Sequence, residues 1–240
     1  MEGIELWHDP QGISFATVPV EEHHEHHPIK SNAFADVVRY RYFEQTGSAL
    51  TQTQLDAVLD HLDTCARFKG KPFETFRRSA WTEEAIYIDL CDAEWRVVRI
   101  TPHGWSVVKA PHVKLLRSPG GRPLPAPEGG YEITELGRFL NLETEDDLML
   151  VACWAVAALA GRGPYPILTI SGEQGSAKSV GTRVLRTLVD PHALPHRALP
   201  ETDRELAIAA RNTHVLAFDN VSSIRRATSD ALCRLATGGG

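Results

Sequence analysis

The stretch of sequence that decides the fold is Gly172-Glu173-Gln174-Gly175-Ser176-Ala177-Lys178-Ser179. It follows the pattern G-x-x-x-x-G-K-[ST], in which glycines let successive backbone N–H groups turn toward phosphate oxygens at the positive end of the next helix. The pattern predicts that Lys178 reaches the β- and γ-phosphates of a nucleoside triphosphate and that the Ser179 hydroxyl coordinates Mg²⁺. Every residue of the stretch is a candidate binding residue, with ATP and Mg²⁺ as the expected cofactors.

Ala177 departs from this pattern, which has glycine before the lysine. A methyl group at that tight position is tolerable only where φ is negative, so we expect a negative φ at Ala177. The flanking sequence fits the pattern, because residues 166–170 form an apolar run typical of a buried strand and residues 178–189 are compatible with a helix. The alternative is a turn rich in glycine and serine that carries an exposed lysine.

A second half of the site follows 40 residues after Ser179. Residues 215–218 form an apolar strand that ends in Asp219, and this segment resembles a Walker B strand. A carboxylate at the carboxyl end of a parallel strand beside the P-loop strand would hold Mg²⁺ through water, next to Ser179. The alternative is an aspartate that only caps the next turn.

The residue after Asp219 bears on hydrolysis. Many ring ATPases have a glutamate there to activate the attacking water, whereas this sequence has Asn220, which cannot accept a proton. Asn220 can still orient water through its amide, or a base can come from Glu173 or from a neighbouring subunit. The candidate catalytic residues are Lys178, Asp219 and Asn220, and hydrolysis depends on a base that the sequence does not identify.

Composition limits the class of protein. With 42% hydrophobic and 23% charged residues, the 240-residue chain is expected to form two lobes. The net charge of -6 gives no overall basic surface, so a contact with nucleic acid must be local or come from assembled subunits. The longest apolar run, Leu148 to Ala160, is shorter than the roughly 20 residues that cross a bilayer and predicts a buried helix. Together with scattered cysteines and no signal peptide, this predicts a cytoplasmic protein without a membrane partner.

The first part of the chain predicts an α+β accessory domain over residues 1–130. Two short strands at 4–7 and 13–18 suit a hairpin, and Ser31 or Asn32 can cap the first of two helices, the second at about 52–67, that form a helical hairpin. Alternating patterns then predict an antiparallel meander with strands at 85–90, 95–100, 105–108 and 113–116. Residues 118–130 are too rich in proline and glycine for a regular element and predict a linker.

Residues 131–240 are expected to form the ATPase core, truncated after the Walker B region. Thr144 can cap a helix over 145–160, and further helices are expected at 178–189, near 203–211 and near 229–235, with strands at 166–170 and 214–218. This order predicts an α/β P-loop NTPase fold, AAA+-like and incomplete at its C-terminus, preceded by the α+β domain.

Further segments around these motifs carry a resemblance to a known family. They are Leu206-Ala207-Ile208-Ala209-Ala210-Arg211-Asn212, Leu216-Ala217-Phe218-Asp219-Asn220 and residues 230–240, with Ile86-Tyr87-Ile88-Asp89-Leu90, Gly104-Trp105 and Pro123-Leu124-Pro125 before them. With the P-loop, they resemble the ATP-binding, helicase-like module of phage, plasmid and integrative-element replication proteins. That module is similar to AAA+ superfamily-three helicases and is often linked to a primase.

The resemblance also implies what this chain lacks. Members of the family often share the departures seen at Ala177 and Asn220. They continue beyond the position of Gly240 through a DNA-contacting loop, a sensor residue and an arginine finger. Since an arginine supplied in trans normally stabilises the transition state, we expect no unaided helicase activity if these 240 residues are the whole protein, although nucleotide binding can survive.

Two other groups of residues have alternative interpretations. The segment 21–27, with four histidines and two flanking glutamates, can ligate zinc or nickel, but adjacent histidines on an extended loop point in different directions, which favours a solvated linker. The basic pairs 77–78 and 225–226, and Arg96 and Arg99 near Trp95 and Trp105, can contact a nucleic-acid backbone or stack on bases. Their alternative is strand packing and surface solvation.

Three hypotheses for the function follow. The first is an ATPase module of a mobile-element DNA replication protein, in which a homo-oligomeric ring couples ATP turnover to movement of single-stranded DNA, with a primase as a further partner. The second is a nucleotide-binding regulatory or assembly module with little or no hydrolysis. The third makes the N-terminal lobe the functional binder and the P-loop a relic.

Overall fold

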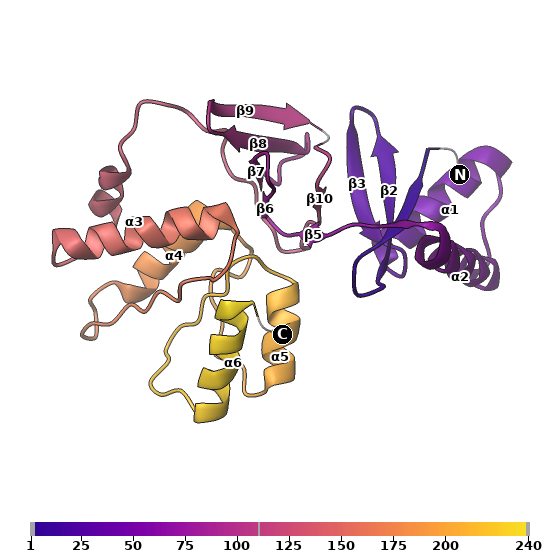
Figure 1. The fold of residues 1–240 in the computed structure, drawn as a ribbon. Helices are drawn as coiled ribbons and strands as arrows, with labels where there is room; N and C mark the ends of the chain where they lie inside the picture. The colour runs from indigo at the N-terminus through magenta and orange to yellow at the C-terminus, as the bar shows by residue number, and fades with distance from the viewer. Residues whose placement is uncertain (1–2, 110, 239–240) are drawn as a thin grey trace. The chain divides into compact units, whose positions relative to one another are not determined.

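The computed structural model in Figure 1 describes residues 3–109 and 111–238, and the chain forms two compact units. Unit 1 consists of Met1–Phe76 and Lys109–Leu116, and unit 2 consists of Arg77–Val108 and Arg117–Gly240. This division differs from the predicted boundary at residue 130. The strands of residues 77–108 belong to the unit that carries the turn at 172–179, because they share an apolar core with its first long helix.

Unit 1 contains a mixed sheet with the strand order β3-β2-β1-β4. The predicted hairpin is confirmed, since β1 (Glu5–His8) pairs antiparallel with β2 (Ser14–Val20). The histidine-rich segment forms β3 (His23–Pro28), antiparallel to β2, and the short β4 (Lys71–Pro72) is parallel to β1. The linker interpretation of 21–27 was therefore wrong, because backbone pairing with β2 draws this segment into the sheet.

The alternative interpretation of the histidines as metal ligands gains no support from the geometry. Side chains alternate between the two faces of a strand, so neighbouring histidines of β3 cannot converge on one ion. Over residues 3–109 and 111–238, no group of three or more His, Cys, Asp or Glu side chains is placed to hold a metal ion. Glu25 instead bridges the imidazoles of His23 and His27, at 3.3 Å and 3.0 Å.

Two helices cover the sheet of unit 1, as the sequence predicts. α1 (Asn32–Thr46) is capped by the Ser31 hydroxyl, and α2 (Gln52–Lys69) begins with a capping box between Thr51 and Gln54. Their apolar faces and the sheet enclose one core, whose large buried side chains are Val18, Ile29, Phe34, Val38, Leu55 and Leu62.

Residues 114–116 return to unit 1 instead of extending the meander. β10 (Lys114–Leu115) pairs parallel with β5 (Thr75–Phe76), so the prediction of a fourth meander strand at 113–116 was wrong. The reason is the aromatic cluster of Trp7, Phe15 and Phe73, in which Leu116 is buried. Lys114 joins it through its ammonium group, which lies 5.1 Å from the Trp7 ring centroid.

A buried polar cluster within unit 1 fixes the protonation of His26. The Thr17 hydroxyl oxygen accepts hydrogen bonds from Trp7 Nε1 (2.9 Å) and from the Lys114 ammonium (3.1 Å), which also contacts Glu5. With both lone pairs of the oxygen engaged, the hydroxyl hydrogen points at Nδ1 of His26, 2.9 Å away. Nδ1 is therefore an acceptor, and the imidazole is neutral.

Acid is expected to destabilise the protein through His26. Burial, followed by the charge of Lys114, lowers the pKa of His26 from 6.5 to about 3. Because the unfolded chain binds this proton more readily, the free energy of unfolding falls as the pH drops from about 6.5 toward about 3, by about 2 kcal/mol at pH 5. Urea unfolding of His26→Asn should depend less on pH over this range, while the exposed control His24→Asn follows the wild type. An unchanged pH dependence in His26→Asn would contradict this assignment.

Unit 2 begins with the antiparallel sheet β6-β7-β8-β9, formed by β6 (Ser79–Trp81), β7 (Ile86–Asp89), β8 (Arg96–Thr101) and β9 (Gly104–Lys109). The last three strands confirm the predicted meander, and β6 was not predicted. One face of the sheet buries Ile88, Leu90 and Val98 against Leu124 and Leu159. Of the predicted basic residues on this sheet, Arg96 pairs with Asp92 at 2.6 Å, while a contact of Arg96 or Arg99 with nucleic acid stays a prediction.

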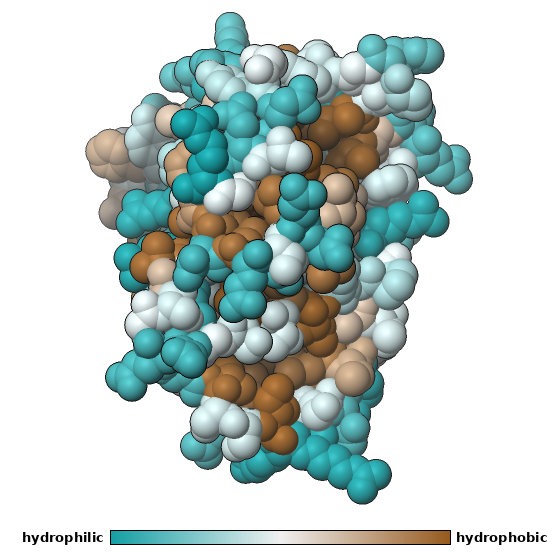
Figure 2. Space-filling model, turned by 90° about the vertical axis from the view of Figure 1, so that its left-hand side faces the viewer, coloured by the Kyte–Doolittle hydropathy of each residue, from teal (hydrophilic) through white to brown (hydrophobic). Residues whose placement is uncertain are grey.

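A short helix and a long one follow the 118–130 segment. They are η1 (Ile133–Phe139), a 3-10 helix that was not predicted, and α3 (Glu145–Ala160), which starts at the predicted cap Thr144. α3 was expected to be buried, but only one side of it is, since Met149, Leu150 and Val156 are exposed. Figure 2, which views the side on the left of Figure 1, shows apolar surface broken by hydrophilic side chains. Within the described residues, none of the helices has the length and apolar character needed to cross a membrane.

The remaining helices of unit 2 agree with the sequence, but the strands between them do not. α4 (Lys178–Val189), α5 (Asp203–Arg211) and α6 (Arg226–Thr237) are present. Residues 166–170 were predicted as a buried strand, yet they form no strand, and Ile167 and Ile170 are exposed. Residues 214–218 make a single parallel bridge, between Arg197 and Phe218. The backbone N–H and C=O groups of a strand need a neighbouring strand as partner. Among the described residues, the Arg197–Phe218 bridge is the only such pairing that either segment makes.

A buried ion-pair network holds unit 2 together around Asp190. Its carboxylate pairs with Arg78 (2.9 Å) and with Arg186 of α4 (2.8 Å), and all three side chains are almost fully buried. Burial opposes ionisation of Asp190, but the two guanidinium groups outweigh it and hold its pKa below the ordinary value. The neighbouring Arg77 donates to the backbone carbonyl of Arg211 at 2.7 Å. The pair 77–78 thus serves the fold, which supports the packing interpretation for these two residues.

Candidate functional site

Residues 172–177 form an exposed turn that leads into α4, and its glycines adopt backbone conformations that other residues avoid. The φ angles of Gly172 and Gly175 are +157° and +86°. A Cβ on Gly172 would lie 2.7 Å from the Ser176 hydroxyl oxygen, so a larger residue would displace Ser176. In the described structure, no side chain caps α4 and its first turn contains no acidic residue. An exposed glycine-containing turn before an uncapped helix fits a phosphate ligand.

Ala177 is the N-cap of α4 and has a φ of +62°. The prediction of a negative φ was therefore wrong. The turn imposes a left-handed conformation on the residue before Lys178, which is the position where the pattern has glycine. A left-handed conformation costs an L-residue about 1–2 kcal/mol, and Ala177 bears this cost within the turn.

Ala177→Gly is expected to stabilise unit 2. The strain of about 1–2 kcal/mol is relieved, and the extra freedom of glycine in the unfolded chain costs about 0.4–1 kcal/mol, so the expected net gain is about 0.5–1 kcal/mol. Urea denaturation measures it. Ala207→Gly is the matched control, because Ala207 is an exposed residue of α5 with ordinary helical geometry and should lose about 1 kcal/mol. Losses of similar size in both variants would show that the turn does not strain Ala177.

The ammonium group of Lys178 is folded back over the turn. Its Nζ donates to the backbone carbonyls of Gly172 (2.7 Å) and Glu173 (2.5 Å) and lies 3.4 Å from Oγ of Ser176. These bonds place the positive charge of Lys178 within the turn, on the backbone carbonyls of Gly172 and Glu173. Glu173 and Gln174 are exposed to solvent, so they contribute to the turn through their backbone groups.

The two predicted magnesium ligands meet, although 40 residues separate them in the chain. Ser179 Oγ donates to Oδ1 of Asp219 at 3.1 Å, and the same oxygen accepts the backbone N–H of Asn220 at 2.9 Å. The other carboxylate oxygen, Oδ2, lies 3.6 Å from Nε2 of His196. A hydroxyl beside a carboxylate is a hard oxygen donor set of the kind that Mg²⁺ prefers, so the residues present fit the expected ion.

Contacts at both ends of α4 explain why Asp219 lies beside Ser179. At the far end, the carboxylate of Asp190 accepts the backbone N–H groups of His214 (3.2 Å) and Val215 (3.1 Å). The helix rises roughly 17 Å from residue 179 to residue 190, and the extended segment 214–219 spans roughly the same distance. The segment therefore runs back along α4 and ends at its first turn.

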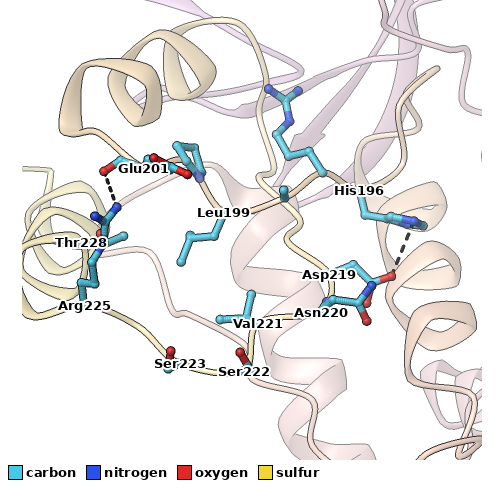
Figure 3. Close-up of a pocket in the computed structure, with 13 residues that line it drawn as sticks. His196, Leu199, Glu201, Asp219, Asn220, Val221, Ser222, Ser223, Arg225 and Thr228 are labelled. Atoms are coloured by element: carbon cyan, nitrogen blue, oxygen red, sulfur yellow. Dashed lines mark hydrogen bonds and ion pairs between the residues drawn. The ribbon is translucent and has the colours of Figure 1, made fainter.

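A cavity of about 640 Å³ opens on the other side of Asp219 (Figure 3). Its lining comes from three places in the sequence: residues 196–201, residues 219–223 with Arg225, and the first turn of α6 at Thr228. Asn220, which the sequence marked as a candidate catalytic residue, lines this cavity and has a φ of +56°. The cavity joins the candidate phosphate site at Asp219.

Sequence reasoning missed the segment that contains His196 and Arg197. The backbone of Arg197 pairs with the Asp219 segment, since its N–H donates to the carbonyl of Ala217 (3.0 Å) and its carbonyl accepts from the N–H of Asp219 (3.1 Å). This parallel bridge brings His196 to the carboxylate. A short run between two prolines has no periodicity to mark it, so only the folded chain identifies these residues.

One comparison with known proteins gives a match, and it covers the site. Residues 133–240 match the family model of the actinomycete integrative conjugative element replication protein. This segment is similar to a mobile-element replication protein. The matched range contains the turn at 172–179, Asp219 and the cavity, and it supports DNA replication of a mobile genetic element as the process. No curated protein and no solved structure matches the chain.

The match agrees with part of what the sequence implied. The resemblance to integrative-element replication proteins is supported for residues 133–240, whereas the segments at 86–90, 104–105 and 123–125 lie before the matched range. The description of the family states neither an ATP-binding module nor a helicase. These finer assignments, and the P-loop NTPase fold class, stay proposals.

Proposed function

We propose that this chain is an ATP-binding module of a mobile-element DNA replication protein and acts as a DNA-dependent ATPase. The observation that carries the proposal is the hydrogen bond between Ser179 and Asp219, 3.1 Å long, beside a glycine-built turn at the start of α4. A turn that only reversed the chain direction would not require contact between a serine and an aspartate that lie 40 residues apart in the sequence. The family match of residues 133–240 supports the setting in DNA replication.

In this proposal, different residues bind the phosphates and the Mg²⁺ ion. The N–H groups of residues 172–178 hold phosphate oxygens, Lys178 neutralises the β- and γ-phosphates, and Ser179 and Asp219 hold Mg²⁺. A Mg²⁺ ion held by Ser179 and Asp219 would stabilise the negative charge of the phosphates. Lys178 must leave the carbonyls of Gly172 and Glu173 to reach a phosphate, so nucleotide binding reorganises the turn.

A binding and a turnover measurement test the proposal together. Calorimetry of the full chain should detect one Mg-ATP site per chain, with weaker binding when Mg²⁺ is chelated. Phosphate release should rise when single-stranded DNA is added. Absence of Mg-ATP binding would refute the proposal in all its forms.

A second candidate function is a nucleotide-binding regulatory or assembly module with little or no hydrolysis. The observation in its favour is Asn220, whose amide faces the cavity at the position where a base would be needed. Tight Mg-ATP binding without phosphate release in any oligomeric state, with or without DNA, would select this candidate. Sedimentation with and without Mg-ATP would then show whether the nucleotide sets the assembly state, including the homo-oligomeric ring or primase complex that we propose as partners.

A further inference from the structure

The cavity beside Asp219 has the size and the lining of a ligand site that the P-loop does not explain. Its volume of about 640 Å³ is within the range of about 300–1,000 Å³ typical of small-molecule sites. Figure 3 shows that its lining runs from Glu201 and Arg225 at one end to His196, Asp219 and Asn220 at the other.

Two arginines of this lining have charges that no carboxylate neutralises. Among the described residues, neither Arg197 nor Arg225 forms an ion pair, although Glu201 and Asp219 also line the cavity. Arg225 is oriented by a 2.6 Å bond from its NH2 group to the backbone carbonyl of Glu201, not to the carboxylate. The carboxylate of Asp219 is engaged by Ser179 and the backbone of Asn220. The Arg225 guanidinium, which bonds a neutral carbonyl, is thus available to an anion.

The rest of the lining suits the other parts of a nucleotide. Leu199 and Val221 give the cavity an apolar surface against which a base or sugar can pack. The hydroxyls of Ser222, Ser223 and Thr228 supply hydrogen bonds for phosphate and sugar oxygens. A guanidinium group, hydroxyls and apolar contacts together are the groups that a phosphodiester and its nucleoside need.

We propose that this cavity binds a nucleotide unit of a single-stranded nucleic acid, with Arg225 on its backbone phosphate. The inference rests on the proposed function, because it assigns a place to the nucleic acid that would stimulate the ATPase. Since the cavity ends at Asp219 and Asn220, a strand bound there lies next to the residues that hold Mg²⁺. Bound DNA would therefore stimulate the ATPase by direct contact with residues beside the nucleotide site.

The basic pair 225–226 offers a matched experiment. Fluorescence anisotropy of a labelled oligothymidylate should show about tenfold weaker binding to Arg225→Gln than to the wild type, because one charged hydrogen bond to phosphate is lost. The slope of log affinity against log salt should fall by about one. Arg226→Gln removes the same charge from the adjacent residue, which does not line the cavity, and should bind as the wild type does. Arg225→Lys keeps a charge and should recover part of the affinity.

The outcomes separate this inference from the proposed function. Lys178→Ala should lose Mg-ATP binding and keep oligonucleotide binding, whereas Arg225→Gln should do the reverse. Equal losses in Arg225→Gln and Arg226→Gln, or no oligonucleotide binding by the wild type at low salt, would overturn the inference and leave ATP binding intact. If Arg225→Gln weakens Mg-ATP binding without DNA as much as it weakens oligonucleotide binding, the cavity belongs to the free nucleotide, and the inference also fails.

Discussion

Lys178→Ala is expected to lower the affinity for Mg-ATP about 100-fold or more while the protein stays folded. Lys178 is the side chain that places a full positive charge inside the turn, where its ammonium group already bonds two carbonyls. Contacts of this group with two phosphates are worth about 1.5–3 kcal/mol each, and a loss of about 3 kcal/mol corresponds to about 100-fold in affinity. Isothermal titration with Mg-ATP measures the change directly.

The control for this variant is a second cation on the same helix. Arg183→Ala removes an exposed charge of α4 about one and a half turns from Lys178 and should leave Mg-ATP affinity within a few-fold of the wild type. Thermal unfolding of both variants checks that the fold is kept. If Lys178→Ala binds Mg-ATP as tightly as Arg183→Ala, the turn at 172–179 is not a phosphate site, and the exposed-lysine interpretation replaces it.

Helix positions could be predicted from the sequence because their signals are local. Thr144 and Thr51 each cap a helix through a side chain three residues before its partner, and both helices begin where the caps place them. The turn at 172–179 is local too, since its glycines carry the required backbone angles within one stretch. The error at Ala177 has a different origin. The residue type of Ala177 does not determine its φ angle, because the geometry of the turn imposes a positive value.

Strand partners and the second half of the site could not be predicted in the same way. The pattern of an apolar strand does not say what it pairs with, so β3 was missed while 166–170 was assigned a strand that does not form. His196 and Arg197 reach Asp219 only through a bridge to residues 217–219. The pairing of Ser179 with Asp219 was anticipated from two motifs, but its cause, the anchoring of both ends of one segment along α4, depends on Asp190 and was not visible in the sequence.

Asp190→Ala is expected to reduce the free energy of unfolding of unit 2 by about 3–5 kcal/mol, the cost of removing one partner from a buried ion pair. The substitution leaves the buried guanidinium groups of Arg78 and Arg186 without a carboxylate, and the N–H groups of His214 and Val215 without an acceptor. Urea denaturation measures the loss.

The surface control for this substitution is Asp203→Ala, which breaks an exposed pair with Arg234 and should cost no more than about 1 kcal/mol. A loss below about 1 kcal/mol for Asp190→Ala would show that the network is dispensable. Because Asp190 anchors the segment that ends at Asp219, the milder Asp190→Asn should weaken Mg-ATP binding as well as stability. It leaves every residue of the phosphate site in place, so a drop in affinity measured at a temperature where the variant is still folded would separate positioning of Asp219 from loss of the fold.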